Sequence, residues 1–421
     1  MRLLLVLAFL LPACAQNATL EFLNRNRPVL DAHNCYPYEG SWGDRIDRAL
    51  GTGFPVGVEQ DLAWYNGRVV VSHTAKTTGS EPLLRDYFFE RVRPMVEKAL
   101  AENEGARWPL IALHFDFKSI EAPLLHAVWD LLGQYEGWIT TAVKTVDPRD
   151  LAPFEPKPLL VLTEDSDAQE RVFFRDIRQG AKLRIFGSAH TAPLTGTPEE
   201  KDHLAATLAP QKLLTMPPTN YRRWWNNSWK EVEEGGQTNA GEWTRADGLR
   251  LRALVEYAHK LGYWIRFYTL DGLVPGESRG WDEQYSFGSL QAGQARWKAA
   301  MDAGVNLIAT DQYEELAKFM KKEGRAPARP RHAPACRDRA ERGPTLPQVS
   351  LQVVGAETMR EGRFARDAAG ADQVGQGLLH GHQAFGPSHR DLGAELMVVA
   401  FAHQGPDRVG GDHDFHRGIA R

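Results

Sequence analysis

Short apolar runs alternate with longer amphipathic stretches between residue 21 and Arg325, a pattern typical of βα units around a parallel sheet. The runs predict eight strands: Pro28–His33, Pro55–Trp64, Leu110–Lys118, Pro158–Thr163, Leu183–Ser188, Lys212–Met216, Tyr263–Leu270 and Asn306–Thr310. The stretches between them predict helices, including Leu84–Glu102, Ala122–Tyr135, Pro198–Leu208, Arg245–Leu261 and Gln291–Ala303. Eight strands in roughly 300 residues predict an α/β fold, a single-domain (β/α)8 TIM barrel. A doubly wound open sheet is the alternative, but no Gly-x-Gly-x-x-Gly or Gly-x-x-x-x-Gly-Lys sequence follows any predicted strand.

The first fifteen residues have the form of an export signal. Arg2 is followed by an apolar run and then by small residues, and this run is too short to span a bilayer as a helix. Cleavage after Ala15, at an Ala-x-Ala pattern, predicts a signal peptide over residues 1–15 and a secreted or periplasmic protein. The alternative is a lipoprotein box, Leu11-Pro12-Ala13-Cys14, which would place a lipid on Cys14.

The last stretch, residues 326–421, differs in composition from the rest of the chain. It contains no Lys, Trp or Tyr, although the chain has 12 Trp and 11 Tyr, and it holds half of the 14 His. Such a composition, with little amphipathic periodicity, is typical of a disordered segment or of GC-rich DNA translated out of frame. We therefore expect one barrel domain over residues 21–325 and a low-order tail that is either genuine protein or frame-shifted sequence.

Composition and charge exclude several classes of protein. Hydrophobic residues make up 43% of the chain and charged residues 25%, which excludes a collagen, a coiled coil or a wholly disordered chain. The formal net charge of -4 argues against a large basic surface, so we expect no nucleic-acid partner. The sequence does not determine an oligomeric state.

Polar residues gather at the ends of the first three predicted strands, where the active site of such a barrel lies. They are His33 and Asn34 in the first strand, Glu59 and Asp61 in the second, and Asp116 and Lys118 in the third. Side chains alternate along a strand, so the two acidic residues of the second strand face the same way. Three carboxylates, with a neutral oxygen from Asn34, form a hard-oxygen site suited to Mg²⁺ or Ca²⁺.

A second histidine, His73, returns to the same rim through the run Gly67–His73. Phosphodiester cleavage needs a base for the attacking hydroxyl, an acid for the departing oxygen and positive charge for the phosphoryl oxygens. His33 as general base or phosphate-stabilising donor and His73 as general acid supply the first two, with the exchanged roles equally open. A divalent cation and Lys118 supply the third. We therefore predict catalytic residues and metal ligands as follows: His33, His73 and Lys118 are catalytic, and Glu59, Asp61, Asp116 and Asn34 bind the metal.

Two further segments contribute candidate substrate-binding residues. Tyr221–Trp229 follows the predicted sixth strand and is dense in aromatic and basic groups. It is suited to clamping a phosphate and an organic headgroup, to contacting a membrane surface, or to packing over the barrel. From this segment we select Trp225, and from the seventh strand Arg266 and Tyr268.

Taken in order along the chain, these motifs resemble the phospholipase-C-like phosphodiesterase superfamily. The superfamily includes glycerophosphodiester phosphodiesterases, phosphatidylinositol-specific phospholipases C and sphingomyelinases D. The resemblance rests on His33-Asn34, Glu59-x-Asp61, Val69–His73 and Asp116-x-Lys118, with weaker matches over Tyr263–Asp271 and Ile308–Asp311. It implies a (β/α)8 barrel with two catalytic histidines and, in most branches, a bound Mg²⁺ or Ca²⁺.

The branch within this superfamily stays open. Glycerophosphodiester phosphodiesterases usually have Arg after the first histidine and Asp after the second, where this chain has Asn34 and Thr74. Asp116-x-Lys118 is more similar to sphingomyelinase D, and His33-Asn34 is more similar to the eukaryotic-type phospholipases C. The resemblance therefore implies a metal-dependent phosphoric diester hydrolase or lyase that acts on a glycerophosphodiester or a phospholipid headgroup through two histidines.

Two other functions are compatible with the same residues. Trp-rich barrels with paired carboxylates also cleave sugars, so a secreted glycoside hydrolase is the first alternative. A non-catalytic binder of phosphoesters or lipids is the second. Metal dependence distinguishes the phosphodiesterase from the glycosidase, and turnover distinguishes either enzyme from the binder.

Overall fold

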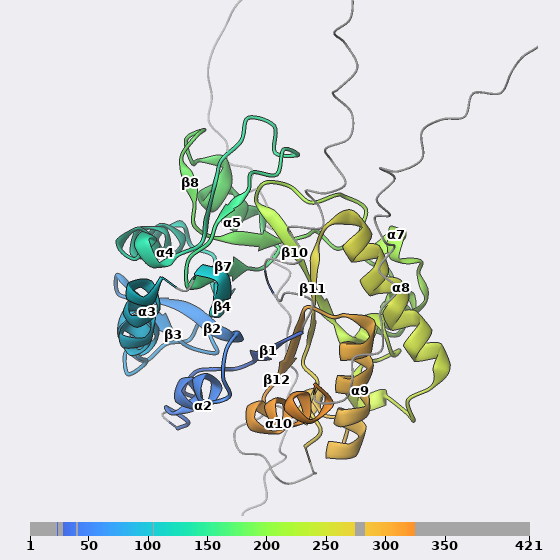
Figure 1. The fold of residues 1–421 in the computed structure, drawn as a ribbon. Coiled ribbons are helices and arrows are strands. Elements are labelled where there is room, and N and C mark those ends of the chain that lie inside the picture. The colour runs from blue at the N-terminus through green and yellow to red at the C-terminus, as the bar shows by residue number, and fades with distance from the viewer. Residues whose placement is uncertain (1–22, 24–27, 39–40, 104, 274–282, 325–421) are drawn as a thin grey trace, which may run out of the picture. The chain divides into compact units, whose positions relative to one another are not determined.

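The computed structural model describes residues 23, 28–38, 41–103, 105–273 and 283–324 (Figure 1). The predicted export signal over residues 1–15 and the predicted tail over residues 326–421 lie outside the described residues. Both therefore stay predictions.

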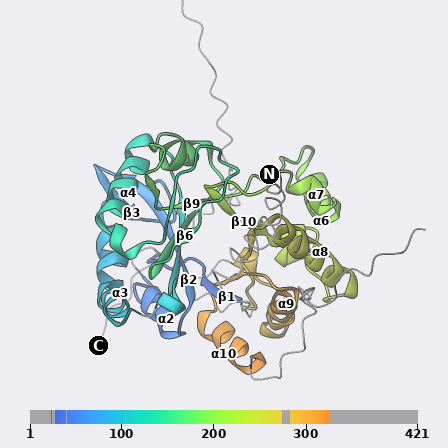
Figure 2. The same cartoon turned by 45° about the horizontal axis from the view of Figure 1, so that its top comes forward.

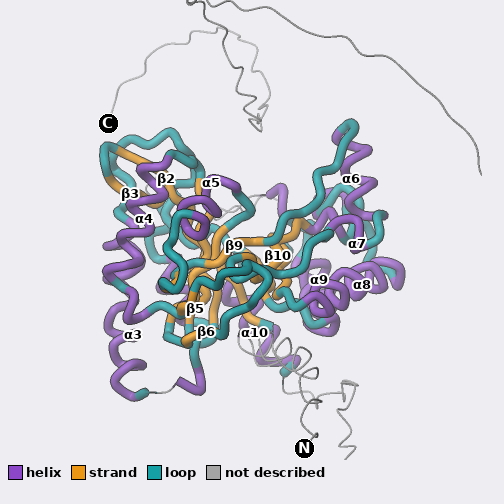
Figure 3. Tube along the Cα trace, turned by 90° about the horizontal axis from the view of Figure 1, so that it is seen from above, coloured by secondary structure: helices purple, strands orange, loops and turns teal. Residues whose placement is uncertain are grey.

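Eight parallel strands close into a barrel. Around the ring they follow the order β1-β12-β11-β10-β9-β7-β4-β2, and β1 pairs with β2 to complete the circle. The strands are β1 (Val29–Ala32), β2 (Val56–Tyr65), β4 (Ile111–Phe117), β7 (Leu159–Thr163), β9 (Phe186–Ser188), β10 (Arg222–Ser228), β11 (Trp264–Tyr268) and β12 (Leu307–Thr310). Seen from above, the strands lie at the centre with α3 and α4 on one side and α8 and α9 on the other (Figure 3). The closed ring confirms the predicted (β/α)8 barrel.

Helices surround the strands. In Figure 2, α2, α3 and α4 lie along one side of the strands and α8, α9 and α10 along the other. Their bounds are α2 (Arg45–Gly51), α3 (Arg91–Glu102), α4 (Ala122–Gln134), α5 (Asp167–Glu170), α6 (Pro198–Thr207), α7 (Pro210–Leu213), α8 (Arg245–Leu261), α9 (Leu290–Ala303) and α10 (Tyr313–Glu323), with π-helical turns at Arg85–Glu90 and Arg171–Arg175. None of these helices, in the part of the chain that the structure describes, is long and apolar enough to cross a membrane.

Local sequence signals explain where the long helix α8 begins and ends. The Thr244 side chain accepts a hydrogen bond from the backbone of Asp247, whose own side chain accepts from the backbone of Thr244. This reciprocal capping box satisfies amide groups that have no partner inside the helix. At the other end, Gly262 adopts a φ of 100°, a left-handed conformation that glycine reaches without the steric cost of a Cβ.

A ninth strand, β3 (Arg68–Val71), pairs antiparallel with β2. The turn between them is Asn66-Gly67, and both residues have positive φ, at 45° and 81°. Asn-Gly is the preferred pair for such a two-residue hairpin turn because both positions require φ above zero. The hairpin continues beyond β3, since the Ser72 amide donates to the Asp61 carbonyl over 3.0 Å. The chain therefore returns beside the end of β2 just before His73.

The predicted sixth strand, Lys212–Met216, was wrong. Pro210 begins helix α7 instead, because proline fits the first turn of a helix, where its missing amide hydrogen is not needed. The sixth barrel strand is β10, which lies within Tyr221–Trp229, the segment that the sequence pattern placed after the sixth strand. The fifth strand was also shorter than predicted: Leu183 belongs to β8 (Lys182–Leu183), which forms a separate sheet with β5 (Thr141–Val143) and β6 (Phe154–Glu155).

Alternation along the strands separates an apolar layer from a polar interior. On β4, Phe115 and Phe117 are buried, and Phe117 packs against Phe173 with ring centroids 5.9 Å apart. The residues between and beside them, His114 and Asp116, contact carboxylate and lysine side chains inside the barrel. The barrel interior at this level is therefore charged rather than apolar.

Candidate active site

The seven predicted catalytic and metal-binding residues meet at one end of the barrel. His33 and Asn34 directly follow β1, Glu59 and Asp61 lie within β2, and Lys118 directly follows β4. The parallel register of β2 and β4 pairs Asp61 with Asp116. His73 reaches the same group from the β2–β3 hairpin. His33, Asn34, Asp116 and Lys118 lie at the carboxyl ends of their strands, where barrel enzymes place their chemistry, and Glu59, Asp61 and His73 reach the same group from β2 and the hairpin.

Three carboxylates form a group suited to a divalent cation. Oxygen atoms of Glu59, Asp61 and Asp116 lie within 4.8 Å of one another. Oxygens that bind one Mg²⁺ or Ca²⁺ each lie about 2.0–2.6 Å from the ion, so they lie within about 5 Å of each other. Glu59 and Asp61 are also almost fully buried, at 4% and 2% exposure, which excludes competing water from most of the group. The donor set therefore fits a divalent cation.

Lys118 shares this carboxylate group. Its Nζ lies 2.8 Å from Asp61 Oδ2 and 2.7 Å from Asp116 Oδ2. Burial alone would lower the pKa of Lys118, but these two carboxylates raise it above its usual range. The ammonium therefore pairs with two of the three carboxylates, offsets one of their two negative charges and competes with any cation for them.

His33 lies between two carboxylates. Its Nδ1 is 3.1 Å from Asp311 Oδ1, and its Nε2 is 3.5 Å from Glu59 Oε2. Burial alone would lower the pKa of His33, but Glu59 and Asp311 raise it to about 9. The surroundings of His33 thus favour the ring that carries both protons.

Asn34 is held by several hydrogen bonds. Its backbone amide donates to Glu59 Oε2 over 3.1 Å, and its Nδ2 donates to Asp311 Oδ2 over 3.1 Å. Its Oδ1 accepts a hydrogen bond of 2.5 Å from the Tyr36 hydroxyl. The structure places Asn34 beside the carboxylate group, and its role as a metal ligand stays a prediction.

His73 is the more open of the two histidines. Its side chain is 39% exposed, against 11% for His33. Its Nδ1 lies 3.1 Å from Asp61 Oδ2 and 2.7 Å from the Tyr36 hydroxyl. The carboxylate group thus contacts two histidines: Glu59 contacts the buried His33, and Asp61 contacts the more exposed His73.

Arg266 lies inside the barrel rather than at its opening. It is 1% exposed, forms an ion pair with Asp31 and donates to Asn226 Oδ1 over 3.0 Å. Its Nη2 lies 3.5 Å from Glu59 Oε1. Burial acts to raise the pKa of Glu59, but His33 and Arg266 hold it well below its usual range. Arg266 therefore stabilises the charge on Glu59 from within, and its predicted contact with substrate is not supported by this position.

Gly57 makes room for the Asp31–Arg266 pair. A Cβ at residue 57 would lie 2.1 Å from Asp31 Oδ1 and 2.9 Å from the Asp31 Cα, closer than van der Waals contact allows. Both β1 and β2 would have to shift to accept it. A glycine at this position is therefore required for the buried pair that supports Glu59.

The other two predicted substrate-binding residues differ in position. The Tyr268 ring lies 6.2 Å from the Tyr285 ring, which in turn packs edge-on against His33 at 5.5 Å, so Tyr268 lies near the site. Trp225 is fully buried on β10, and its Nε1 donates to Thr191 Oγ1 over 2.8 Å. Its chain neighbour Asn226 faces the interior, so alternation directs Trp225 away from the site. The structure does not bring Trp225 into the cluster.

Sequence reasoning missed several partners of the site. His114 lies 3.3 Å from Glu59 Oε1 and 2.6 Å from Glu164 Oε1. Burial alone would lower the pKa of His114, but Glu164 is the main influence that raises it to about 10. Strand alternation places His114 on the same face as Asp116, and Glu164 directly follows β7, so both carried a signal. The sequence signal for Asp311 and Tyr36 was weaker. Each of them only follows the end of a predicted strand, Asn306–Thr310 or Pro28–His33.

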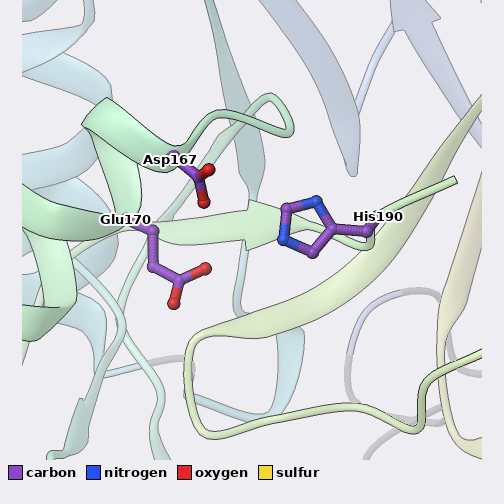
Figure 4. A group of neighbouring side chains, drawn as sticks. All are labelled: Asp167, Glu170 and His190. Atoms are coloured by element: carbon purple, nitrogen blue, oxygen red, sulfur yellow. The ribbon is translucent and has the colours of Figure 1, made fainter. Parts of the chain in front are cut away.

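A second group of potential metal ligands lies at the ends of β7 and β9. Asp167 and Glu170 face His190 across a short gap (Figure 4). Arg175 already lies 3.3 Å from Asp167 and 3.1 Å from Glu170, and Arg222 also pairs with Glu170. Because arginine side chains neutralise these carboxylates, we assign no metal to this group.

Comparisons with known proteins give matches to solved structures only. No family model and no protein of curated function matches the sequence. Two glycerophosphodiester phosphodiesterases from Parabacteroides distasonis match. One is 13% identical over 71% of this chain and 98% of its own length, with a TM-score of 0.39. The other is 11% identical over 73% of this chain and 92% of its own length, with a TM-score of 0.35. An HPPK-DHPS protein from Plasmodium falciparum matches with 9% identity over 71% of this chain and 48% of its own, at 0.37. Because different proteins match at similar scores, the function of this chain has to be inferred from its own site.

Proposed function

We propose that the protein is a metal-dependent phosphodiesterase that cleaves a glycerophosphodiester or a phospholipid headgroup. The observation that carries the proposal is the placement of two histidines around one carboxylate group. His33 Nε2 lies 3.5 Å from Glu59, and His73 Nδ1 lies 3.1 Å from Asp61. A phosphodiester needs one proton acceptor, one proton donor and concentrated positive charge. The two histidines supply the first two, and Lys118 with a divalent cation on the carboxylate group would supply the third.

The two histidines differ in what their surroundings favour. Both ring nitrogens of His33 face carboxylates, which stabilise a doubly protonated ring. Nδ1 donates to Asp311 over 3.1 Å, so Nε2, at 3.5 Å from Glu59, is the nitrogen that would donate to a phosphoryl or departing oxygen. His73 is open on one side and exchanges a proton with the attacking hydroxyl. This is one of the two assignments that the sequence left open.

Glu59, Asp61 and Asp116 would hold the divalent cation. When bound, such a cation neutralises charge on the phosphoryl oxygens and polarises the phosphorus–oxygen bond. Lys118, which pairs with two of the same carboxylates, is the protein's own positive group for a phosphoryl oxygen. Arg266 holds Glu59 from inside the barrel and keeps it ionised.

The test compares single variants on bis-(p-nitrophenyl) phosphate and on a panel of lysophospholipids and glycerophosphodiesters, with Mg²⁺, Ca²⁺ or EDTA. His33→Ala and His73→Ala are each expected to lower turnover by at least ~10²-fold, the usual contribution of an acid–base group. His203→Ala is the control, because His203 is an exposed residue of α6 whose imidazole pairs with Glu234 on the surface. Unchanged turnover in both active-site variants would end the assignment of the two histidines, and cleavage of these phosphodiesters that survives EDTA would refute the metal dependence.

A further inference from the structure

Tyr36 connects the two halves of the site. It lies two residues after Asn34, and its side chain is buried at 1% exposure. Its hydroxyl lies 2.5 Å from Asn34 Oδ1 and 2.7 Å from His73 Nδ1. Its ring stacks on the His73 ring, with centroids 6.0 Å apart and planes 25° apart. One buried phenol thus contacts both the Asn34 amide and the imidazole of His73.

The orientation of Asn34 determines where the Tyr36 proton goes. Asp311 accepts a hydrogen bond from Asn34 Nδ2 over 3.1 Å, which turns Oδ1 of the same amide toward Tyr36. An amide oxygen can only accept, and a phenol has a single proton to donate. Tyr36 therefore donates to Asn34, and its oxygen is left to accept from His73.

The second neighbour of His73 Nδ1 is also an acceptor. Asp61 Oδ2 lies 3.1 Å from this nitrogen. With a phenol oxygen and a carboxylate oxygen both facing Nδ1, that nitrogen has to carry the hydrogen. In a neutral imidazole one ring nitrogen donates and the other accepts, so Nε2 of His73 holds the free lone pair.

We propose that Tyr36 is a positioning residue that holds His73 in the Nδ1–H tautomer and so presents Nε2 as the nitrogen that reacts. This assignment rests on the proposed phosphodiesterase function for its role in turnover. The geometry of the tautomer does not depend on it. His73 is then suited to take a proton from the attacking hydroxyl through Nε2.

Asp61 does not make Tyr36 redundant. Asp61 Oδ2 also pairs with Lys118 at 2.8 Å and belongs to the carboxylate group suited to a cation. The Tyr36 oxygen lies nearer to Nδ1 than Asp61 does, at 2.7 Å against 3.1 Å. Arg45, itself buried, holds the Tyr36 loop by donating to the Asn34 carbonyl over 2.7 Å and to the Tyr36 carbonyl over 3.3 Å. The Tyr36 oxygen is therefore held in place as an acceptor for the hydrogen on His73 Nδ1, whereas Asp61 also binds Lys118.

The direct test is long-range ¹H–¹⁵N correlation spectroscopy of the full chain labelled with ¹⁵N-histidine, in mildly alkaline buffer with Mg²⁺. A His73→Gln variant identifies the His73 signals by their loss. Wild-type protein is expected to show a protonated Nδ1 and an unprotonated Nε2, and Tyr36→Phe to gain a population protonated at Nε2. A wild-type ring protonated at Nε2, or a Tyr36→Phe spectrum identical to wild type, would overturn the proposal.

Kinetics on the same variants measure the role in turnover. Tyr36→Phe keeps the ring that stacks on His73 and is expected to lower kcat by at least ~10-fold with KM little changed, part of the ~10²–10⁴ that acid–base catalysis contributes. Tyr38→Phe is the matched control, because Tyr38 packs edge-on against the same imidazole at 5.4 Å. Equal kcat values for the two variants would refute the positioning role. If wild-type protein cleaves no phosphodiester, the proposed function fails, and the spectra still decide the tautomer.

Discussion

Replacement of Lys118 by methionine tests whether a lysine and a cation share the carboxylate group. The Lys118 ammonium lies 2.7–2.8 Å from oxygens of Asp61 and Asp116, two of the three carboxylates that we assign to the metal. Methionine keeps most of the length of the side chain and removes its charge. We expect the variant to bind Mg²⁺ or Ca²⁺ more tightly than wild type and to cleave phosphodiesters more slowly.

The size of the effect follows from electrostatics. A unit charge and a divalent cation about 4 Å apart repel each other by about 2 kcal/mol even at the dielectric constant of bulk water. We use this lower value because the Lys118 and Asp116 side chains are 22% and 35% exposed, and solvent screens partly exposed charges. Removing the ammonium also frees both carboxylates for the cation. A gain of about 2 kcal/mol corresponds to a Kd at least ~10-fold lower.

Isothermal titration calorimetry with Mg²⁺ and Ca²⁺ measures the affinity of Lys118→Met and wild type. Lys298→Met is the control, because Lys298 pairs with Asp302 on the exposed surface of α9 and should leave the affinity unaltered. An affinity for both cations that stays the same or weakens in Lys118→Met would refute the idea that the lysine competes for these carboxylates.

Three further predictions concern side chains around and behind the site. Trp225→Ala is expected to lower the free energy of unfolding in urea by about 3–5 kcal/mol with KM unchanged, and a large rise in KM would restore Trp225 as a substrate contact. Arg266→Met leaves Asp31 without its buried counter-charge, removes one of the cations beside Glu59 and should cost about 3–5 kcal/mol in the same assay, so a loss under about 1 kcal/mol would contradict its role. Burial raises the pKa of Glu231 from 4.5 to about 8. Between pH 4.5 and about pH 8, Glu231 is therefore protonated in the folded chain and ionised in the unfolded chain, so the free energy of unfolding falls as pH rises. Glu231→Gln removes that fall, and its advantage in melting temperature over wild type should grow from about pH 4.5 and level off above about pH 8; a constant difference would argue against the shift.

The candidate site residues were predictable because polar residues within or directly after an apolar strand carry a local signal. His33, Glu59 and Asp116 each interrupt an apolar run with a polar residue, and period-two alternation decides which side chains of one strand face together. The return of His73 was predictable from the Asn66-Gly67 turn, which reverses the chain after β2. These features depend only on neighbouring residues, so sequence alone determines them.

The supporting residues depend on contacts that the local pattern does not contain. Strand β10 has a polar sequence because Asn226 and Arg222 face charged partners, Glu164 and Asp165, and a pattern search for apolar alternation misses such a strand. Trp225 illustrates the consequence: because Tyr221–Trp229 was placed after the sixth strand rather than in it, a buried core residue was selected as a substrate-binding one. Arg266 was expected at the pocket, because nothing near it in sequence indicates that Asp31 lies beside it.

The pairings of Arg266 with Asp31 and of Asp311 with His33 join residues 235 and 278 positions apart. The candidate catalytic and metal-binding side chains all lie within the first third of the chain, whereas these two partners lie in β11 and directly after β12. During synthesis a ribosome therefore delivers every candidate site residue well before the residues that orient and neutralise them. Contacts between such distant segments form late in folding because long loops must close first. The proposed activity should then appear only when β12 joins β1, and an N-terminal half expressed alone should gain it only when the other half is supplied.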